Sequence, residues 1–136
     1  MRRSLGFLFL LSLTFCLYFG QLLPTWQVAT AVSPDASLLV QQGIVLYQAG
    51  NYKDAIAPWQ TALNLYQKTK NPANATLVQE NLARAYEQIG ESASAVDLWD
   101  LAIAYYRQIK DISQVGRLLT EQAQSYTNLG QPRKAI

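Results

Sequence analysis

Residues 43–66 read GIVLYQAGNYKDAIAPWQTALNLY, and the same frame returns at residues 83–106 as ARAYEQIGESASAVDLWDLAIAYY. Each stretch carries a glycine, a tryptophan, spaced alanines and a tyrosine at matching positions, and Gly50 and Gly90 lie forty residues apart. A third copy begins near the C-terminus and includes Gly130. Self-similarity at a fixed period of roughly 20–50 residues is typical of stacked repeat arrays, which usually work as binding surfaces.

The first 31 residues have the composition of an export signal. They begin with Met1-Arg2-Arg3, continue without a charge over residues 5–23, and end in Ala29-Thr30-Ala31. A basic start, an apolar middle and a small-residue exit are the parts of a signal peptide, although an apolar stretch of roughly 7–15 residues is usual. About 20 apolar residues also suffice to span a bilayer. We expect residues 1–31 to be a cleaved signal peptide or a membrane anchor, and residues 32–35 a linker.

Such a leader predicts an exported protein, held in the cell envelope or periplasm or released outside the cell. The chain has 11 Lys+Arg and 9 Asp+Glu, and the two leader arginines account for the whole excess. Because the remainder is balanced and has no run of like charges, we expect no nucleic-acid binding. The only cysteine, Cys16, lies in the leader. The part beyond residue 31 therefore has no thiol nucleophile and no disulfide.

From residue 36 onward, hydrophobic spacing and breakers predict a series of helices. The expected spans are about 37–49, 52–70, 73–89, 92–109 and 112–129, with another helix beginning at Pro132. Gly50 tolerates the positive φ of a helix C-terminus, and Asn51 can cap the next helix. Asn71-Pro72 is expected to close that helix. Pro58 conflicts with its helix, so we expect a local kink or a helix that starts late.

Small residues at matching positions predict close helix crossings, with aromatic residues filling the gaps beside them. Gly43 is one such position, and Trp59 and Trp99 recur on the side that carries the alanines. We therefore interpret the tryptophans as core residues and not as ligand-stacking aromatics. Tyr105 and Tyr106 are adjacent and point in different directions, so at most one of them is fully interior.

These residues resemble the tetratricopeptide repeat. The resemblance is carried by a run that matches the family motif: Gly43, Leu46, Tyr47, Gly50, Tyr52, Ala55, Ile56, Trp59, Ala62 and Leu63, with counterparts from Leu82 to Ile103 and from Ala123 to Ile136. It covers residues 36–136, divided at about 36–72, 73–111 and an incomplete 112–136. It implies an all-α fold of antiparallel helix pairs stacked as a right-handed solenoid.

Two departures from the family pattern concern length. The period is 40 residues instead of the usual 34, and no proline ends a repeat at Gln67 or Arg107. Longer second helices account for the additional residues. The third copy stops at Ile136, within its second helix. We therefore expect the chain to be the N-terminal part of something longer, or a truncated relic.

Some segments are similar to exported repeat proteins of cyanobacteria, in which such arrays often precede a caspase-like peptidase module of the CHAT type. The similar segments are 47–52 (YQAGNY), 80–86 (ENLARAY) and 114–117 (QVGR). The peptidase activity cannot be carried over, because it needs a histidine and a cysteine. This chain has no histidine, and no cysteine beyond its leader. The resemblance implies an alternative in which the chain is the N-terminal regulatory array of a larger peptidase.

The residue types argue against catalysis by this chain alone. Without histidine, Ser-His-Asp and Cys-His arrangements and the usual zinc sites are excluded. Each glycine is isolated, so no phosphate-binding loop is present. Asp97 and Asp100 lie three residues apart, a spacing typical of a solvated helix face. We expect no enzyme activity, no cofactor and no metal.

In the tetratricopeptide family the first helices of the pairs line a concave groove, and ligands lie across it. The resemblance implies groove positions at Val40, Ile44, Tyr47, Glu80, Arg84, Glu87, Thr120, Gln124 and Thr127, with Arg117 and Asn128 beside them. A subset of the family grips peptide carboxylates there. Only Arg84 suits that role here, and Glu80 one turn away is expected to pair with it. We expect a groove for a protein or peptide, or an array face with no dedicated ligand.

Overall fold

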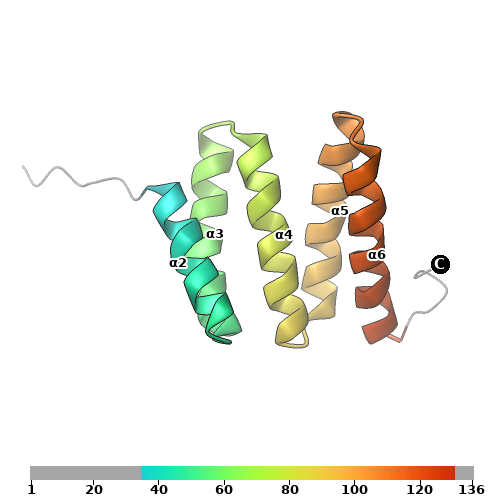
Figure 1. Cartoon of the computed structure of the whole chain (residues 1–136), viewed down its shortest axis with the longest axis horizontal. Helices are drawn as coiled ribbons and strands as arrows, with labels where there is room; N and C mark the ends of the chain where they lie inside the picture. Colours follow the sequence, from blue (N-terminus) through green and yellow to red (C-terminus); the bar gives the residue numbers. More distant parts are fainter. Residues whose placement is uncertain (1–34, 131–136) are drawn as a thin grey trace, which may run out of the picture. The chain divides into compact units, whose positions relative to one another are not determined.

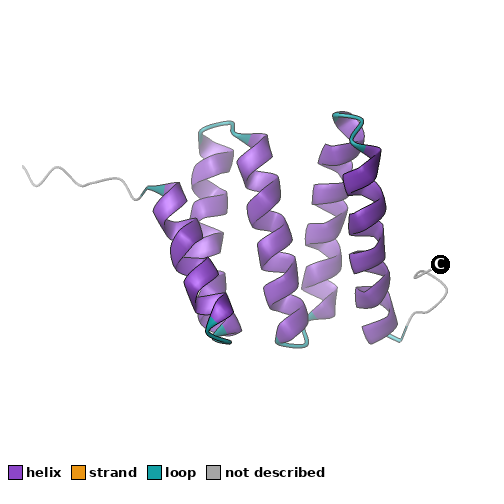
Figure 2. Ribbon diagram, in the orientation of Figure 1, coloured by secondary structure: helices purple, strands orange, loops and turns teal. Residues whose placement is uncertain are grey.

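The computed structural model describes residues 35–130, which form five α-helices (Figure 1). The helices are α2 (Ala36–Gln48), α3 (Tyr52–Lys68), α4 (Pro72–Gln88), α5 (Ser92–Gln108) and α6 (Ile112–Asn128). Between residues 35 and 130 there is no strand (Figure 2). The expected leader, most of the linker and the helix at Pro132 lie outside the described residues.

Each helix packs against the next one in the chain, and α3 and α5 lie behind α2 and α6 in Figure 1. The turns are short, because three residues separate the end of one helix from the start of the next. Such turns join antiparallel helices. The bounds of α5 (92–108) are those of α3 (52–68) shifted by forty positions, and α6 (112–128) follows α4 (72–88) in the same way.

The helices from α2 to α5 end in the same kind of turn, with either a glycine or a lysine at its left-handed position. Gly50 and Gly90 close α2 and α4 with φ of 80° and 79°, as their position predicts. Lys70 and Lys110 close α3 and α5 in the same left-handed region, at φ of 54° and 60°. A positive φ is uncommon for residues with a side chain, because the Cβ crowds the backbone. These two lysines were not expected at the turns.

Of the two expectations about caps, the one for Asn51 was wrong. Asn51 occupies the cap position of α3, but its side chain accepts no hydrogen bond from that helix. Asn71 closes α3 as expected, because its N–H donates to the Tyr66 carbonyl at 2.8 Å. Its side chain also caps the next helix by accepting a hydrogen bond from the Asn74 N–H at 3.2 Å, and Pro72 is the first residue of α4. Proline suits this position because the first helical N–H has no intrahelical partner.

Pro58 lies inside α3, which begins at Tyr52 and continues to Lys68. A late start of this helix is therefore excluded. Pro58 is buried, so its ring contributes to packing, while its missing N–H leaves the Asp54 carbonyl without the usual helical donor.

The core consists of two clusters along the array. One centres on Trp59, which is 2% exposed, and the other on Trp99, which is 1% exposed. Around them lie fully buried small residues that bring neighbouring helices close: Ala55, Ala62, Ala85, Ala95 and Ala102. Tyr106 is buried and Tyr105 is half-buried. The core roles predicted for the tryptophans and Tyr106 are confirmed.

Candidate functional site

Two adjoining hollows lie on the face formed mainly by α2, α4 and α6, the first helices of the pairs. The first, about 270 Å³ in volume, is lined by Ile44, Tyr47, Gln48, Trp59, Asn81 and Arg84. The second, about 290 Å³, is lined by Tyr47, Arg84, Glu87, Gln88, Glu121, Gln124 and Asn128. Because both contain Tyr47 and Arg84, they adjoin along this face. We call the two hollows together the first-helix groove.

Tyr47 is the aromatic centre of the groove. Its ring centroid lies 5.0 Å from that of Tyr52 and 5.7 Å from that of Trp59. Burial raises the pKa of Tyr47 above its ordinary value of 10.0, and nearby Tyr52 raises it further. The hydroxyl therefore stays neutral at physiological pH. The ring offers an apolar wall with a polar tip, which is the usual combination at binding surfaces.

Glu80 lies beneath the groove and not on its surface, which corrects its predicted role. The residue is only 4% exposed. Its carboxylate accepts hydrogen bonds from the Tyr106 hydroxyl at 2.9 Å, from Arg84 at 3.1 Å and from Arg117 at 2.6 Å. These donors come from α4, α5 and α6, so Glu80 ties three helices together. Burial, and then the hydrogen bond to Glu80, raise the pKa of Tyr106 to about 12.

Arg84 is held by several partners at once. Besides its ion pair with Glu80, which confirms the predicted pairing, it donates to the Asn81 side chain at 3.5 Å. Its guanidinium also lies 5.5 Å from the centroid of the Trp99 ring. Since a guanidinium over an indole face is attracted to it, this contact adds to the ion pair. Because these side chains already engage the guanidinium of Arg84, it is poorly placed to bind the carboxylate of a peptide.

Two carboxylates give the second hollow an acidic character. One oxygen of Glu87 accepts from the Asn128 amide at 2.8 Å and from the Ser92 hydroxyl at 3.2 Å. Its other oxygen, Oε1, is buried and has no hydrogen-bond partner among the described residues. Glu121 is exposed and makes no ion pair within residues 35–130. Neither carboxylate forms an ion pair within residues 35–130, although Arg84 lines the same hollow.

The structure brings together five of the nine predicted groove residues. Ile44, Tyr47, Arg84, Glu87 and Gln124 line the hollows. The other four do not. Glu80 is buried, Val40 packs against the core, and the two threonines Thr120 and Thr127 are exposed outside the linings, where their hydroxyls donate to carbonyls one turn earlier.

Besides Trp59, which was assigned to the core alone, four lining residues were missed by the sequence reading, and all four lie three or four positions from a residue already named. They are Gln48, Asn81, Gln88 and Glu121. On a helix, residues three or four apart lie on the same face. Extending each predicted position by one helical turn would therefore have found them.

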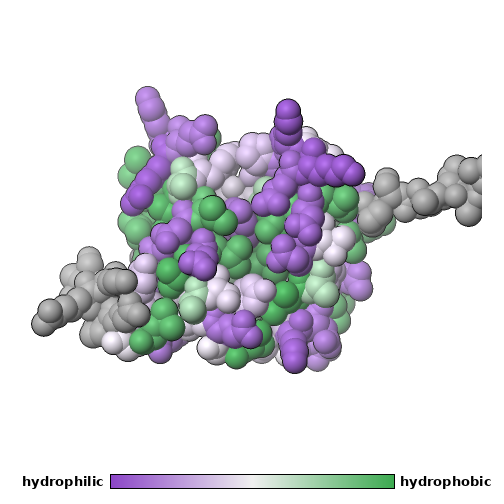
Figure 3. All heavy atoms as spheres, turned by 180° about the vertical axis from the view of Figure 1, so that it is seen from behind, coloured by the Kyte–Doolittle hydropathy of each residue, from purple (hydrophilic) through white to green (hydrophobic). Residues whose placement is uncertain are grey.

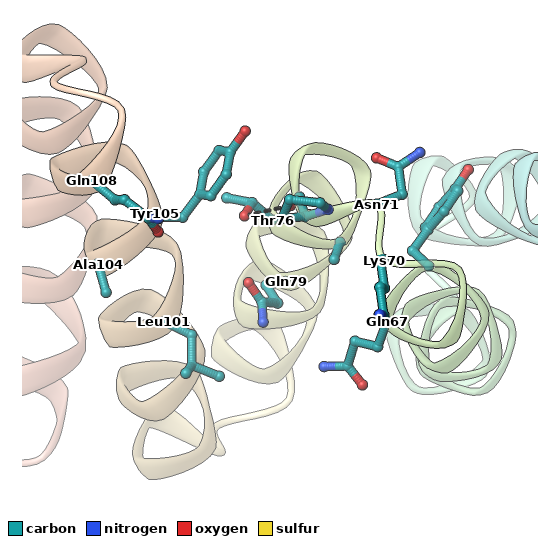
Figure 4. Close-up of a pocket in the computed structure, with 12 residues that line it drawn as sticks. Gln67, Lys70, Asn71, Thr76, Gln79, Leu101, Ala104, Tyr105 and Gln108 are labelled. Carbon is teal, nitrogen blue, oxygen red and sulfur yellow. Dashed lines mark hydrogen bonds between the residues drawn. The ribbon is translucent and has the colours of Figure 1, made fainter.

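A larger hollow, of about 590 Å³, is formed by the end of α3, the beginning of α4 and the second half of α5 (Figure 4). We call it the α3/α5 hollow. It contains two tyrosines, Tyr66 and Tyr105, and several carboxamides. It shares no lining residue with the first-helix groove.

Within residues 35–130, no group of three or more His, Cys, Asp or Glu side chains is placed to hold a metal ion. No helix in that range is both long and apolar enough to cross a membrane. The apolar stretch at residues 5–23, to which the expectation of a membrane anchor refers, lies outside it.

Comparison with known proteins agrees with the fold. Residues 35–98 match the family model described as tetratricopeptide repeat. Among solved structures, the TPR domain of Arabidopsis FLU superposes with a TM-score of 0.68 at 20% sequence identity, over 74% of this chain and 84% of that one. No curated protein matches. Tetratricopeptide repeats generally form non-catalytic scaffolds that bind proteins. Residues 35–98 are therefore similar to the tetratricopeptide repeat in sequence, and the chain shares the fold of a TPR domain.

Proposed function

We propose that the chain is a non-catalytic scaffold that binds an extended peptide segment of another protein in the first-helix groove. The observation that carries this proposal is the pair of adjoining hollows, which share Tyr47 and Arg84 and are lined mainly by α2, α4 and α6. An elongated groove with an aromatic wall and scattered polar groups suits a peptide, because side chains enter the hollows while polar groups fix the register.

The charges in the groove favour a basic segment. Arg84 is already paired with Glu80, so it leaves little positive charge for an acidic ligand. Glu87 and Glu121 have no ion-pair partner in the described part of the chain, and Oε1 of Glu87 accepts no hydrogen bond there. A lysine or arginine of the ligand supplies the donors and the charge that these carboxylates lack. An apolar or aromatic neighbour of that residue then packs against Tyr47.

Selection from a random peptide library displayed on phage tests this function. The immobilised chain is expected to enrich peptides in which a lysine or arginine adjoins an apolar residue. Tyr47→Ala removes the aromatic wall, and we expect it to weaken the selected peptides about tenfold, as for a central interface residue. Tyr105→Ala, on the α3/α5 hollow, is the matched control and is expected to leave their affinity unchanged. If the selected peptides bind Tyr47→Ala and Tyr105→Ala equally well, their binding site lies outside the first-helix groove.

We also propose that the protein is exported, on the basis of the leader composition of residues 1–31. The alternative is attachment to a membrane through residues 5–23. Mass spectrometry of the protein isolated from its host separates these. Val32 as the first residue indicates cleavage and release, whereas an intact Met1 indicates that the leader is retained.

The alternative of a regulatory array in a larger caspase-like peptidase stays a prediction. No residue described here bears on it, because the catalytic histidine and cysteine would lie in another part of a longer protein. Sequencing the gene beyond codon 136 tests it. A continuing reading frame with further repeats and a His/Cys module would support this alternative, and an immediate stop codon would count against it.

A further inference from the structure

The α3/α5 hollow is separate from the first-helix groove, although α4 contributes to both. Gln79 lines the hollow, and Gln88 lines the groove. They are nine residues apart on one helix, and at 3.6 residues per turn this places them on opposite sides of α4. At about 590 Å³, the hollow has a volume typical of ligand-binding clefts. It is therefore large enough to hold a ligand of its own.

Gln79 forms part of the floor of this hollow. The residue is 8% exposed, and its carboxamide makes no hydrogen bond to any residue between 35 and 130. Figure 4 shows the carboxamide directed into the space between Gln67 of α3 and Leu101 of α5. Its oxygen and nitrogen are not among the buried unpartnered atoms, so they reach the solvent in the hollow, and a ligand that enters can replace the water there. The carboxamide offers both donors and an acceptor, which is the pattern that a peptide group matches.

The walls of the hollow carry further carboxamide groups and add apolar surface. Gln67 from α3 and Gln108 from α5 bring further carboxamides. Tyr105 is half-buried, and Leu101 is 54% exposed, a high value for a large hydrophobic residue. A short extended peptide suits these walls: its backbone amides meet the carboxamides, and an apolar side chain covers Leu101.

The charge around the hollow is positive. No acidic residue lines it, and Lys70 is the one charged residue that does. Three more cations, Lys68, Arg107 and Lys110, lie at the same ends of α3 and α5 outside the lining, and Asp111, just before α6, is the acidic residue beside them. Residues 35–130 contain seven lysines and arginines, so four of the seven gather here. None of the four forms an ion pair within that range. Figure 3 shows hydrophilic side chains projecting along the upper edge of this face.

From these observations we propose that the α3/α5 hollow binds an extended acidic peptide segment of a partner protein, independently of the first-helix groove. The Gln79 carboxamide pairs with a peptide group of the segment. Leu101 and Tyr105 cover an apolar side chain, and the cations at the ends of α3 and α5 attract the adjacent carboxylates. The two faces of the array thereby select opposite charges.

Three matched peptides test the proposal: acetyl-Ala-Leu-Glu-Glu-Ala-amide and its counterparts with Gln-Gln or Lys-Lys in place of Glu-Glu. Each is titrated into the full ¹⁵N-labelled chain. The acidic peptide is expected to shift the side-chain amide signals of Gln79 and Gln108, while the amide signals of Arg84 and Gln124 in the groove stay in place. The glutamine peptide is expected to bind several-fold more weakly, and the lysine peptide not detectably.

Two variants complete the test. Gln79→Leu keeps the side-chain volume and removes the carboxamide, and is expected to weaken the acidic peptide about fivefold, as for one hydrogen bond. Lys70→Gln lies at an exposed turn and is expected to weaken it by a similar factor, so the test holds even where Gln79→Leu unfolds. Equal binding of all three peptides, or unchanged affinity in both variants, would overturn the proposal. So would inorganic phosphate or a short oligonucleotide that displaces the acidic peptide completely, since that would indicate a general anion surface.

Discussion

The indole N–H of Trp59 donates a hydrogen bond to the main-chain oxygen of Val40 at 3.0 Å, across the first helix pair. This contact depends on Gly43, because a Cβ at that position would overlap the indole ring. In the second pair Ala83 stands at the equivalent position, and the N–H of Trp99 is buried without a hydrogen-bond partner among the described residues. The two tryptophans share one place in the repeat but differ in how their polar atom is satisfied.

The first prediction concerns Gly43. Gly43→Ala is expected to lower the free energy of unfolding by about 1–3 kcal/mol, because the new methyl group displaces the Trp59 ring and breaks its hydrogen bond to Val40. Gly116→Ala in α6 is the matched control. Nothing lies within 4 Å of a Cβ there, so the better helix propensity of alanine is expected to raise stability by about 0.5–1 kcal/mol. Urea unfolding of both variants measures the difference. Two changes of the same sign would show that the Trp59 contact does not limit residue 43.

The second prediction concerns the turns between helices. Gly90 has a φ of 79° and open space around it, so Gly90→Ala tests backbone conformation alone. We expect a loss of about 1 kcal/mol in the free energy of unfolding. Lys110 has a φ of 60° at the corresponding turn after α5. Lys110→Gly is expected to raise stability by up to about 1 kcal/mol, because the left-handed strain is relieved. Thermal unfolding compares the two variants, and a destabilising Lys110→Gly would refute the assigned strain.

The third prediction concerns pH. The pKa of Tyr106 is about 12 in the folded chain, above the ordinary 10.0, because of burial and the hydrogen bond to Glu80. A folded pKa above the unfolded one means that the stabilisation is complete below pH 10 and is lost as the pH rises towards 12. Tyrosinate absorbance is expected to show a late-titrating group that Tyr106→Phe removes. The free energy of unfolding of Tyr106→Phe is expected to fall less steeply above pH 10. An unchanged late phase in that variant would assign it to another tyrosine.

The fourth prediction concerns the charge of the groove. Glu121→Gln is expected to weaken a basic library-selected peptide about threefold to fivefold, because a charge-assisted contact becomes a neutral one. The native affinity is expected to fall as salt rises, and the variant is expected to show a weaker dependence. Asp97→Asn, on α5, is the matched control and is expected to change neither quantity. Isothermal titration at two salt concentrations measures both. If both variants lost the same peptide affinity, the net charge of the protein would explain the effect, and a local contact at Glu121 would not.

Much of the fold could be predicted from the sequence, because local rules decide it. The glycine and tryptophan positions indicated the helix pairs and the core, and helical bounds agree within about two residues with those expected. The turns at Lys70 and Lys110 could not be anticipated in this way. Lysine is not a residue that favours a positive φ, so only the geometry of the neighbouring helices explains its conformation there.

The candidate site was predicted less completely. Helical spacing placed Glu80 on the groove face, but its donors Tyr106 and Arg117 come 26 and 37 residues later in the chain. Contacts at that distance follow from tertiary packing, which single-sequence patterns do not contain. No sequence pattern indicated the α3/α5 hollow either. Glutamines such as Gln79 form no motif, and the hollow exists only where three helices meet.

The central claim, that the first-helix groove binds a peptide, is tested most directly by mapping where a library-selected peptide lies on the chain. A ¹⁵N chemical-shift titration of the full chain with one such peptide gives this map. The account predicts saturable shifts gathered at Tyr47, Arg84, Gln88, Glu121 and Gln124, with the signals of Gln67, Gln79 and Gln108 unchanged. Shifts confined to the α3/α5 hollow, or spread over both faces without saturation, would contradict it.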